Sequence, residues 1–266
     1  MDYYKYFLSA RDEYETSENA SLKSFYQDPV VNLTGNIYSA KYLQEVQSLA
    51  GKVKEEFDKG HQSGLMLNAK DIWKYENHIT NLSNIIVPFL EENRFGCNLY
   101  VDKIYIYRTL KIKKRESSYL WHYDNNPTEI VKNIIYLNDV SELNSPFEFL
   151  CDSTEKGLIV TPSRRGPNHW APAENNSRIT EKQINSLANK GYSGKKVFGK
   201  IGTIYSFNNN AIHRVNPIIE GYRDVINIRV KPTIKKLENY VDRRWTTGHE
   251  KSGAVNPCPN IIGDTK

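Results

Sequence analysis

The feature that most constrains the fold of this chain is a series of short segments rich in Tyr, Ile and Val that begins near residue 98. β-Branched and aromatic residues favour strands, and the Pro, Gly, Asn and charged residues between the segments favour turns. Many short strands joined by turns predict an antiparallel sandwich or barrel. The segments expected to form strands are 98–110, 119–124, 131–137, 147–150, 157–161, 203–207 and 224–230.

The chain before residue 98 has a different pattern, with apolar residues at helical spacing. One helix is expected over 39–59, where Ser39 is a suitable N-cap. A second is expected over 78–93, broken or bent by Pro88. We therefore predict that residues 1–97 form a helical platform on one face of the strands.

The length favours one domain over 1–266, because 266 residues with 39% hydrophobic content can bury one substantial core. The strand-rich core would cover 98–232. A polar stretch with one expected helix, 163–200, interrupts it, and such an insertion is either a lid over a binding site or a surface excursion. The charged segment 233–266 is expected to form a C-terminal tail.

Composition narrows the class of protein. No apolar run approaches the roughly 18 residues that a membrane span needs, and the N-terminus carries charges where a signal peptide would be apolar. We therefore expect a soluble, cytoplasmic protein without a membrane partner. Three scattered cysteines suggest neither a disulfide framework nor a zinc ribbon. The net charge of +5 is mixed along the chain, so no nucleic-acid partner is expected.

One group of residues points to metal chemistry. His122 and Asp124 lie two apart in an expected strand, so their side chains would share a face. His213 follows an apolar segment that begins at a glycine turn, and Arg223 opens the next expected strand. Two histidines and one carboxylate can hold Fe(II) and leave positions open for other ligands.

The spacing alone does not establish this site, because chance supplies a His-x-Asp triplet in roughly one such chain in four. His169 also has an arginine nine residues later, Arg178. It lies in the polar insertion between prolines, however, which is a poor setting for a rigid ligand. His213 is therefore the favoured second histidine.

These residues are similar to the Fe(II)/2-oxoglutarate-dependent oxygenase superfamily, and in particular to its phytanoyl-CoA dioxygenase-like branch. The similarity covers roughly 98–232 and includes the Trp-His-Tyr-Asp run that ends at Asp124, the segments 134–140 and 144–149, and the span from His213 to Arg223. It implies a double-stranded β-helix, a cupin-like jelly roll with the metal between its sheets. The usual Pro-Gly-Ser-His turn is replaced by Leu-Cys-Asp-Ser-Thr over 150–154, so the substrate side is expected to differ.

The resemblance implies a role for each residue. His122, Asp124 and His213 would bind Fe(II), and the co-substrates 2-oxoglutarate and O2 would take the open positions. Arg223 would bind the distal carboxylate of 2-oxoglutarate, since a guanidinium offers two parallel N–H donors and stays charged when buried. Asp124 favours hydroxylation, desaturation or cyclisation, because the related halogenases have a small residue there.

Other site residues are less constrained. The strand before His122 should add a 2-oxoglutarate contact from Tyr107 or Arg108, only one of which can face the cavity. Tyr107 could instead be an aromatic core residue, and Trp121, which alternates away from His122, could simply pack. The candidates for substrate contacts are Trp121, Asn125, Arg164, Trp170 and Arg229.

The sequence thus predicts an Fe(II)/2-oxoglutarate-dependent dioxygenase that oxidises an unactivated C–H bond of a small polar metabolite or amino-acid derivative. Succinate and CO2 would be the co-products. Two alternatives remain open at this stage. One is a protein or peptide hydroxylase of the same superfamily, and the other is a metal-free jelly-roll binding protein.

Overall fold

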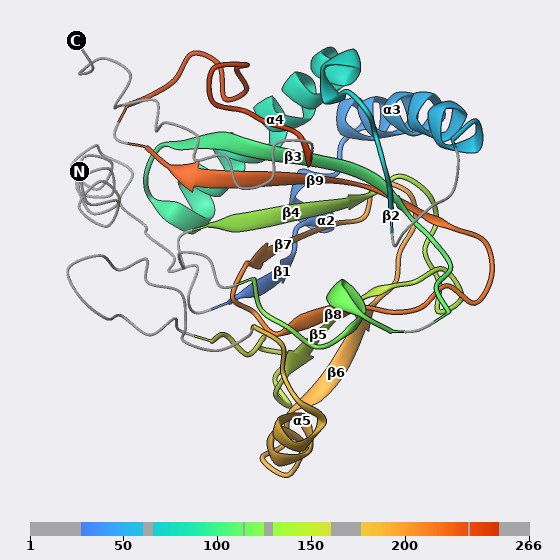
Figure 1. Cartoon of the computed structure of the whole chain (residues 1–266). Coiled ribbons are helices and arrows are strands. Elements are labelled where there is room, and N and C mark those ends of the chain that lie inside the picture. The colour runs from blue at the N-terminus through green and yellow to red at the C-terminus, as the bar shows by residue number, and fades with distance from the viewer. Residues whose placement is uncertain are drawn as a thin grey trace.

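The structure, a computed structural model, describes residues 28–60, 66–113, 115–124, 130–160, 177–233 and 235–249. Two antiparallel sheets dominate it, and helices cover the larger sheet on one side (Figure 1). The mainly β architecture agrees with the expectation and is consistent with a jelly roll. None of the described helices is long and apolar enough to cross a membrane.

The larger sheet has six strands in the order β1-β7-β4-β9-β3-β2. Antiparallel pairing joins all neighbours, and a β-bulge interrupts the pairing of β3 and β9 between Val101 and Lys103. The strands are β1 (Val30–Asn32), β2 (Met66–Asn68), β3 (Leu99–Thr109), β4 (Val131–Tyr136), β7 (Ile204–Asn208) and β9 (Arg223–Pro232).

The smaller sheet has three strands in the order β6-β5-β8, formed by β6 (Ser193–Val197), β5 (Phe147–Cys151) and β8 (His213–Val215). It faces the side of the larger sheet that is turned away from the helices (Figure 1). Phe147 and Phe149 of β5 share a buried apolar cluster with Tyr136, Phe207 and Val225 of the larger sheet. This cluster fills part of the space between the sheets.

The helical layer consists mainly of α3 (Ala40–Asp58) and α4 (Glu76–Leu90), with the short α2 (Thr34–Ile37) beside them. The prediction for 39–59 is confirmed, since the Ser39 side chain caps α3 by accepting from the backbone N–H of Tyr42. Pro88 lies in the last turn of α4 and does not break it. A π-helical turn, Glu91–Phe95, follows directly. Apolar residues of both helices share one core with β3, β4 and β9.

Two predicted strands are wrong in detail. The segment 119–124 follows a 3-10 turn, Ser117–Tyr119, and makes only single bridges from His122 to His213 and Arg178. The described part of the segment 157–161 also shows isolated bridges, at Gly157 and Ile159, in place of a strand. The segment 119–124 forms no longer ladder because its partner, β8, has only three residues. Strands β1, β2, β6 and β8 were not predicted.

The predicted helix of the insertion is confirmed as α5 (Glu181–Ala188). Thr180 and Gln183 form a capping box at its start, and Gly191 adopts a φ of 89° just beyond its end. Strand β6 also lies within 163–200 and pairs with β5. The last part of the predicted insertion is therefore sheet.

Part of the predicted C-terminal tail packs against β3. The backbone N–H of Ile104 donates to the carbonyl of Thr247 at 2.9 Å, and the N–H of Thr247 donates to the backbone carbonyl of Asp102 at 3.1 Å. Trp245 is buried beside Tyr100. The described residues of this segment thus cover the edge of β3 that the short β2 leaves open.

Candidate metal centre

The structure brings the three predicted metal ligands together. One potential ligand atom from each of His122, Asp124 and His213 lies within 4.8 Å of the others. The two histidines exchange backbone hydrogen bonds, with N···O distances of 3.0 and 2.8 Å. This reciprocal pair places the imidazole rings 4.3 Å apart between their centroids. This single bridge between His122 and His213 therefore brings the two side chains together, although a longer strand was expected here.

Both imidazoles are oriented by hydrogen bonds from Nδ1. His122 Nδ1 lies 2.8 Å from the carbonyl of Leu120, and His213 Nδ1 lies 2.7 Å from the carbonyl of Ala211. Because a carbonyl oxygen only accepts, Nδ1 must carry the proton in each ring. The Nε2 lone pairs remain available for a metal ion, which is the usual orientation of a metal-binding histidine.

The local electrostatics favour the protonation states that metal ligands need. Burial, reinforced by the neighbouring His213, lowers the pKa of His122 to about 3, and burial also lowers the pKa of His213. Burial alone would raise the pKa of Asp124, but Lys132 and the two histidines outweigh it and hold that pKa below its usual range. Neutral imidazoles and an ionised carboxylate result.

Lys132 was missed by the sequence analysis. It lies on β4, and its ammonium forms an ion pair with Oδ2 of Asp124 at 2.5 Å. The other oxygen, Oδ1, lies 3.8 Å from Nε2 of His122. The ion pair therefore leaves Oδ1 directed toward the histidines. A lysine at an inward position of the apolar strand 131–136 was the signal that could have identified it.

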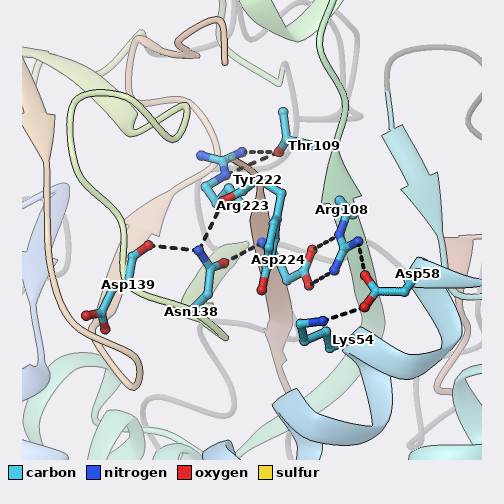
Figure 2. Close-up of polar contacts among 9 residues, drawn as sticks. All are labelled: Lys54, Asp58, Arg108, Thr109, Asn138, Asp139, Tyr222, Arg223 and Asp224. Atoms are coloured by element: carbon cyan, nitrogen blue, oxygen red, sulfur yellow. Dashed lines mark hydrogen bonds and ion pairs between the residues drawn. The ribbon is translucent and has the colours of Figure 1, made fainter. Parts of the chain in front are cut away.

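Arg223, the first residue of β9, is fully buried on the same inner side. Its Nε and Nη2 donate to the hydroxyl of Thr109 at 3.2 and 3.0 Å (Figure 2). Its Nη1 is buried without a hydrogen-bond partner in the part of the chain that the structure describes. A buried guanidinium is costly without an anion, so this arrangement fits a ligand carboxylate.

The backbone on both sides of Arg223 is held by one side chain. Asn138 donates from Nδ2 to the carbonyl of Tyr222 at 3.0 Å, and its Oδ1 accepts from the N–H of Asp224 at 2.7 Å (Figure 2). The Asn138 side chain therefore fixes the backbone of the residues before and after Arg223. Sequence reasoning did not identify Asn138, because its partners lie more than 80 residues away.

Arg108 occupies the opposite face of β3. Its Nε and Nη2 each lie 2.7 Å from a carboxylate oxygen of Asp224, and its Nη1 lies 2.7 Å from Asp58 of α3 (Figure 2). The guanidinium also stacks over the ring of Tyr222 at 4.1 Å. The predicted contact between Arg108 and 2-oxoglutarate is therefore corrected, because strand alternation turns this residue toward the helices.

Tyr107 faces the inner side and packs in the apolar cluster with Tyr136 and Val225. Its burial agrees with a core residue, and its predicted co-substrate contact remains a prediction. Trp121 packs against Arg214, whose guanidinium carbon lies 4.2 Å from the ring centroid. Arg229 pairs with Asp102. Three predicted substrate residues lie outside the described residues, namely Asn125, Arg164 and Trp170.

Comparison with known proteins identifies similar solved structures. The epimerase SnoN, solved with Fe3+, alpha-ketoglutarate and nogalamycin RO, aligns with a TM-score of 0.53 and 15% identity over 78% of this chain and 80% of SnoN. EctD from S. alaskensis, solved with 2-oxoglutarate and 5-hydroxyectoine, aligns with a TM-score of 0.49 and 15% identity over 78% of this chain and 73% of EctD. HygX from Streptomyces hygroscopicus, solved with nickel and 2-oxoglutarate, aligns with a TM-score of 0.48 and 13% identity over 80% of this chain and 86% of HygX.

No protein-family model and no curated protein matches the sequence. At these levels of identity the structural similarity concerns the fold. The chain has the fold of SnoN, a protein crystallised with iron and alpha-ketoglutarate, and within that fold it brings two histidines, a carboxylate and a buried arginine to one side of the larger sheet.

Proposed function

We propose that this protein is a non-haem Fe(II)/2-oxoglutarate-dependent oxygenase. The observation that carries the proposal is the convergence of His122, Asp124 and His213 inside a fold that also buries Arg223 without a counter-ion among the described residues. This convergence also disfavours the metal-free binding protein that the sequence left open. When bound, Fe(II) with 2-oxoglutarate and O2 would supply the oxidation of an unactivated C–H bond, with succinate and CO2 as co-products.

The two histidines would bind the metal through Nε2, since Nδ1 is engaged with the backbone in both. Asp124 would use Oδ1, because Lys132 occupies Oδ2. A carboxylate held in this way favours one oxygen toward the metal and leaves more positions for other ligands. Lys132 thus acts by orienting Asp124.

Arg223 and Thr109 would bind the distal carboxylate of 2-oxoglutarate. The free Nη1 of Arg223 can donate to one oxygen of that carboxylate. The hydroxyl of Thr109 accepts from Arg223, so its own hydrogen remains available for the same ligand. Burial removes competing water and strengthens both interactions.

The reaction is proposed to be a hydroxylation, desaturation or cyclisation of a small polar metabolite or amino-acid derivative. An aspartate at the carboxylate position supports this choice over halogenation. A lid within 163–200 remains a prediction, and α5 is the described helix of that segment.

An anaerobic titration tests the proposal. Fe(II) and 2-oxoglutarate added to the protein should give a weak visible absorption band near about 500 nm, typical of the chelate at such a site. Asp124→Ala should abolish the band, and Arg223→Met should shift its formation to much higher 2-oxoglutarate concentration. Arg244→Met, at an exposed arginine, is the charge-matched control. Absence of the band in the folded wild-type protein would refute the proposal.

A further inference from the structure

Three cations lie side by side on the inner face of the larger sheet. The register places Lys103 of β3 opposite Arg229 of β9, and Arg229 opposite Lys132 of β4. Directly opposed residues of antiparallel strands point to the same side, with Cβ atoms about 5 Å apart. Lys132 contacts Asp124, so this cationic row of Lys103, Arg229 and Lys132 borders the metal centre.

The acidic residues around the row do not balance it. Asp102 binds Arg229 and lies 2.9 Å from Lys231, and it enters this face because of the bulge that precedes Lys103. Asp124 pairs with Lys132, but it is also the proposed metal ligand. Within the described residues Lys103 has no ion pair and no hydrogen bond of its side chain, although it is only 6% exposed. Like charges directly opposite each other on a sheet oppose folding, so an unmatched buried row needs an anion.

With Arg223 binding the distal carboxylate of 2-oxoglutarate, as proposed above, this row would take a different anion. Arg223 and Arg229 lie six residues apart on β9, which is about 20 Å along a strand. The metal ligand Asp124 lies at the Lys132 end of this interval. Asn227, between the two arginines on the same face, is 5% exposed, and its Oδ1 has no partner among the described residues. A second polar ligand on this side of the metal would satisfy both features.

We propose that Lys103, Arg229 and Lys132 form a subsite for an anionic group of the substrate, a carboxylate or a phosphate or sulfate ester, held beside the metal. The proposal rests on the proposed function for the reaction and adds the substrate class. The ion pair with Asp102 holds Arg229 in place, and the ion pair with Asp124 holds Lys132 in place. Lys103 has no such partner among the described residues, so its ammonium would donate its hydrogen bonds to the ligand.

The test uses the full chain loaded anaerobically with Fe(II) and 2-oxoglutarate, so that Arg223 and the metal are occupied. Isothermal titration at constant ionic strength measures the binding of sulfate, which represents the ester anions, and of acetate, which represents carboxylates. At least one anion should bind saturably, and Lys103→Met should weaken it about tenfold or more, as expected for a charged hydrogen bond. Lys103→Arg should retain most of the affinity.

Lys41→Met is the matched control, since Lys41 is an exposed lysine on α3 and its removal changes the net charge equally. The Lys103 side chain has no hydrogen bond or ion pair within the described residues, and thermal unfolding would verify that the variant folds. No saturable binding of either anion, or equal binding by the wild type and Lys103→Met, would overturn the subsite.

The same samples separate this proposal from the proposed function. If the visible band forms but no anion binds through Lys103, the subsite is wrong and the oxygenase assignment stands. If no band forms but anion binding still depends on Lys103, the oxygenase assignment is wrong and an anion site remains. Weaker 2-oxoglutarate binding in Lys103→Met, without an effect on sulfate or acetate, would reassign the row to the co-substrate and overturn the proposal.

Discussion

Arg108 offers a sharp test of the structure, because the sequence suggested a co-substrate contact and the fold shows a structural ion pair. The side chains of Arg108 and Asp224 are only 6% and 3% exposed, and two hydrogen bonds of 2.7 Å join them. The third bond of Arg108 reaches Asp58, which is 44% exposed. Solvent screens the contact with Asp58, so the pair with Asp224 accounts for most of the stability that Arg108 contributes.

Arg108→Met would leave the carboxylate of Asp224 buried without its partner. Breaking a buried pair in this way costs about 3–5 kcal/mol. For a protein of this size each kcal/mol lowers Tm by about 2–4 °C, so the expected decrease is about 6–20 °C. Adding Asp224→Asn to the same chain removes the stranded charge and should recover a large part of this loss.

The assay is thermal unfolding followed by circular dichroism, with Arg244→Met as control because the pair of Arg244 and Asp242 is largely exposed. Binding of 2-oxoglutarate to the folded Arg108→Met protein should remain close to that of the wild type. A Tm equal to that of the control, combined with loss of 2-oxoglutarate binding, would refute the structural role and restore the contact suggested by the sequence.

Three further predictions concern the surroundings of the site. Thr109→Val removes the acceptor of two Arg223 hydrogen bonds and should weaken 2-oxoglutarate binding about tenfold or more in the anaerobic titration; unchanged affinity would contradict the role of the hydroxyl. Asn138→Ala frees the backbone on both sides of Arg223, so it should lower the free energy of unfolding in urea by about 1–2 kcal/mol and weaken 2-oxoglutarate binding. A loss of stability without weaker 2-oxoglutarate binding would contradict a positioning role for Asn138. Burial raises the pKa of Glu91 to about 7, so the folded state binds the extra proton and the free energy of unfolding should fall as pH rises from about 5 to 8. Glu91→Gln should remove most of that fall, and parallel pH profiles would disprove this cause.

The helices illustrate how far local pattern carries. The apolar spacing of 39–59 and the cap at Ser39 were sufficient to predict α3, because a helix satisfies its hydrogen bonds within one segment. The capping box of Thr180 is equally local. Strands β1, β2, β6 and β8 were not predicted, since β1, β2 and β8 have three residues each and β6 is largely polar. Such strands are defined by their partners.

The metal centre shows a mixed outcome. Alternation correctly placed His122 and Asp124 on one side, although the backbone between Tyr119 and Asp124 makes only isolated bridges. Alternation also required Tyr107 and Arg108 to face opposite sides. It could not say which side was the interior, because a one-residue change of register reverses every side chain of a strand.

The sequence by itself determined the residue types of the centre, the helices and the mainly β class, since these depend on side-chain chemistry and short-range periodicity. Only the tertiary structure decided which charges meet. Lys132 reaches Asp124, Arg108 reaches Asp224, and Lys103 lies across from Arg229 because of strand order and register. Those pairings join segments up to 126 positions apart by number, and no local pattern encodes which strand becomes the neighbour of another.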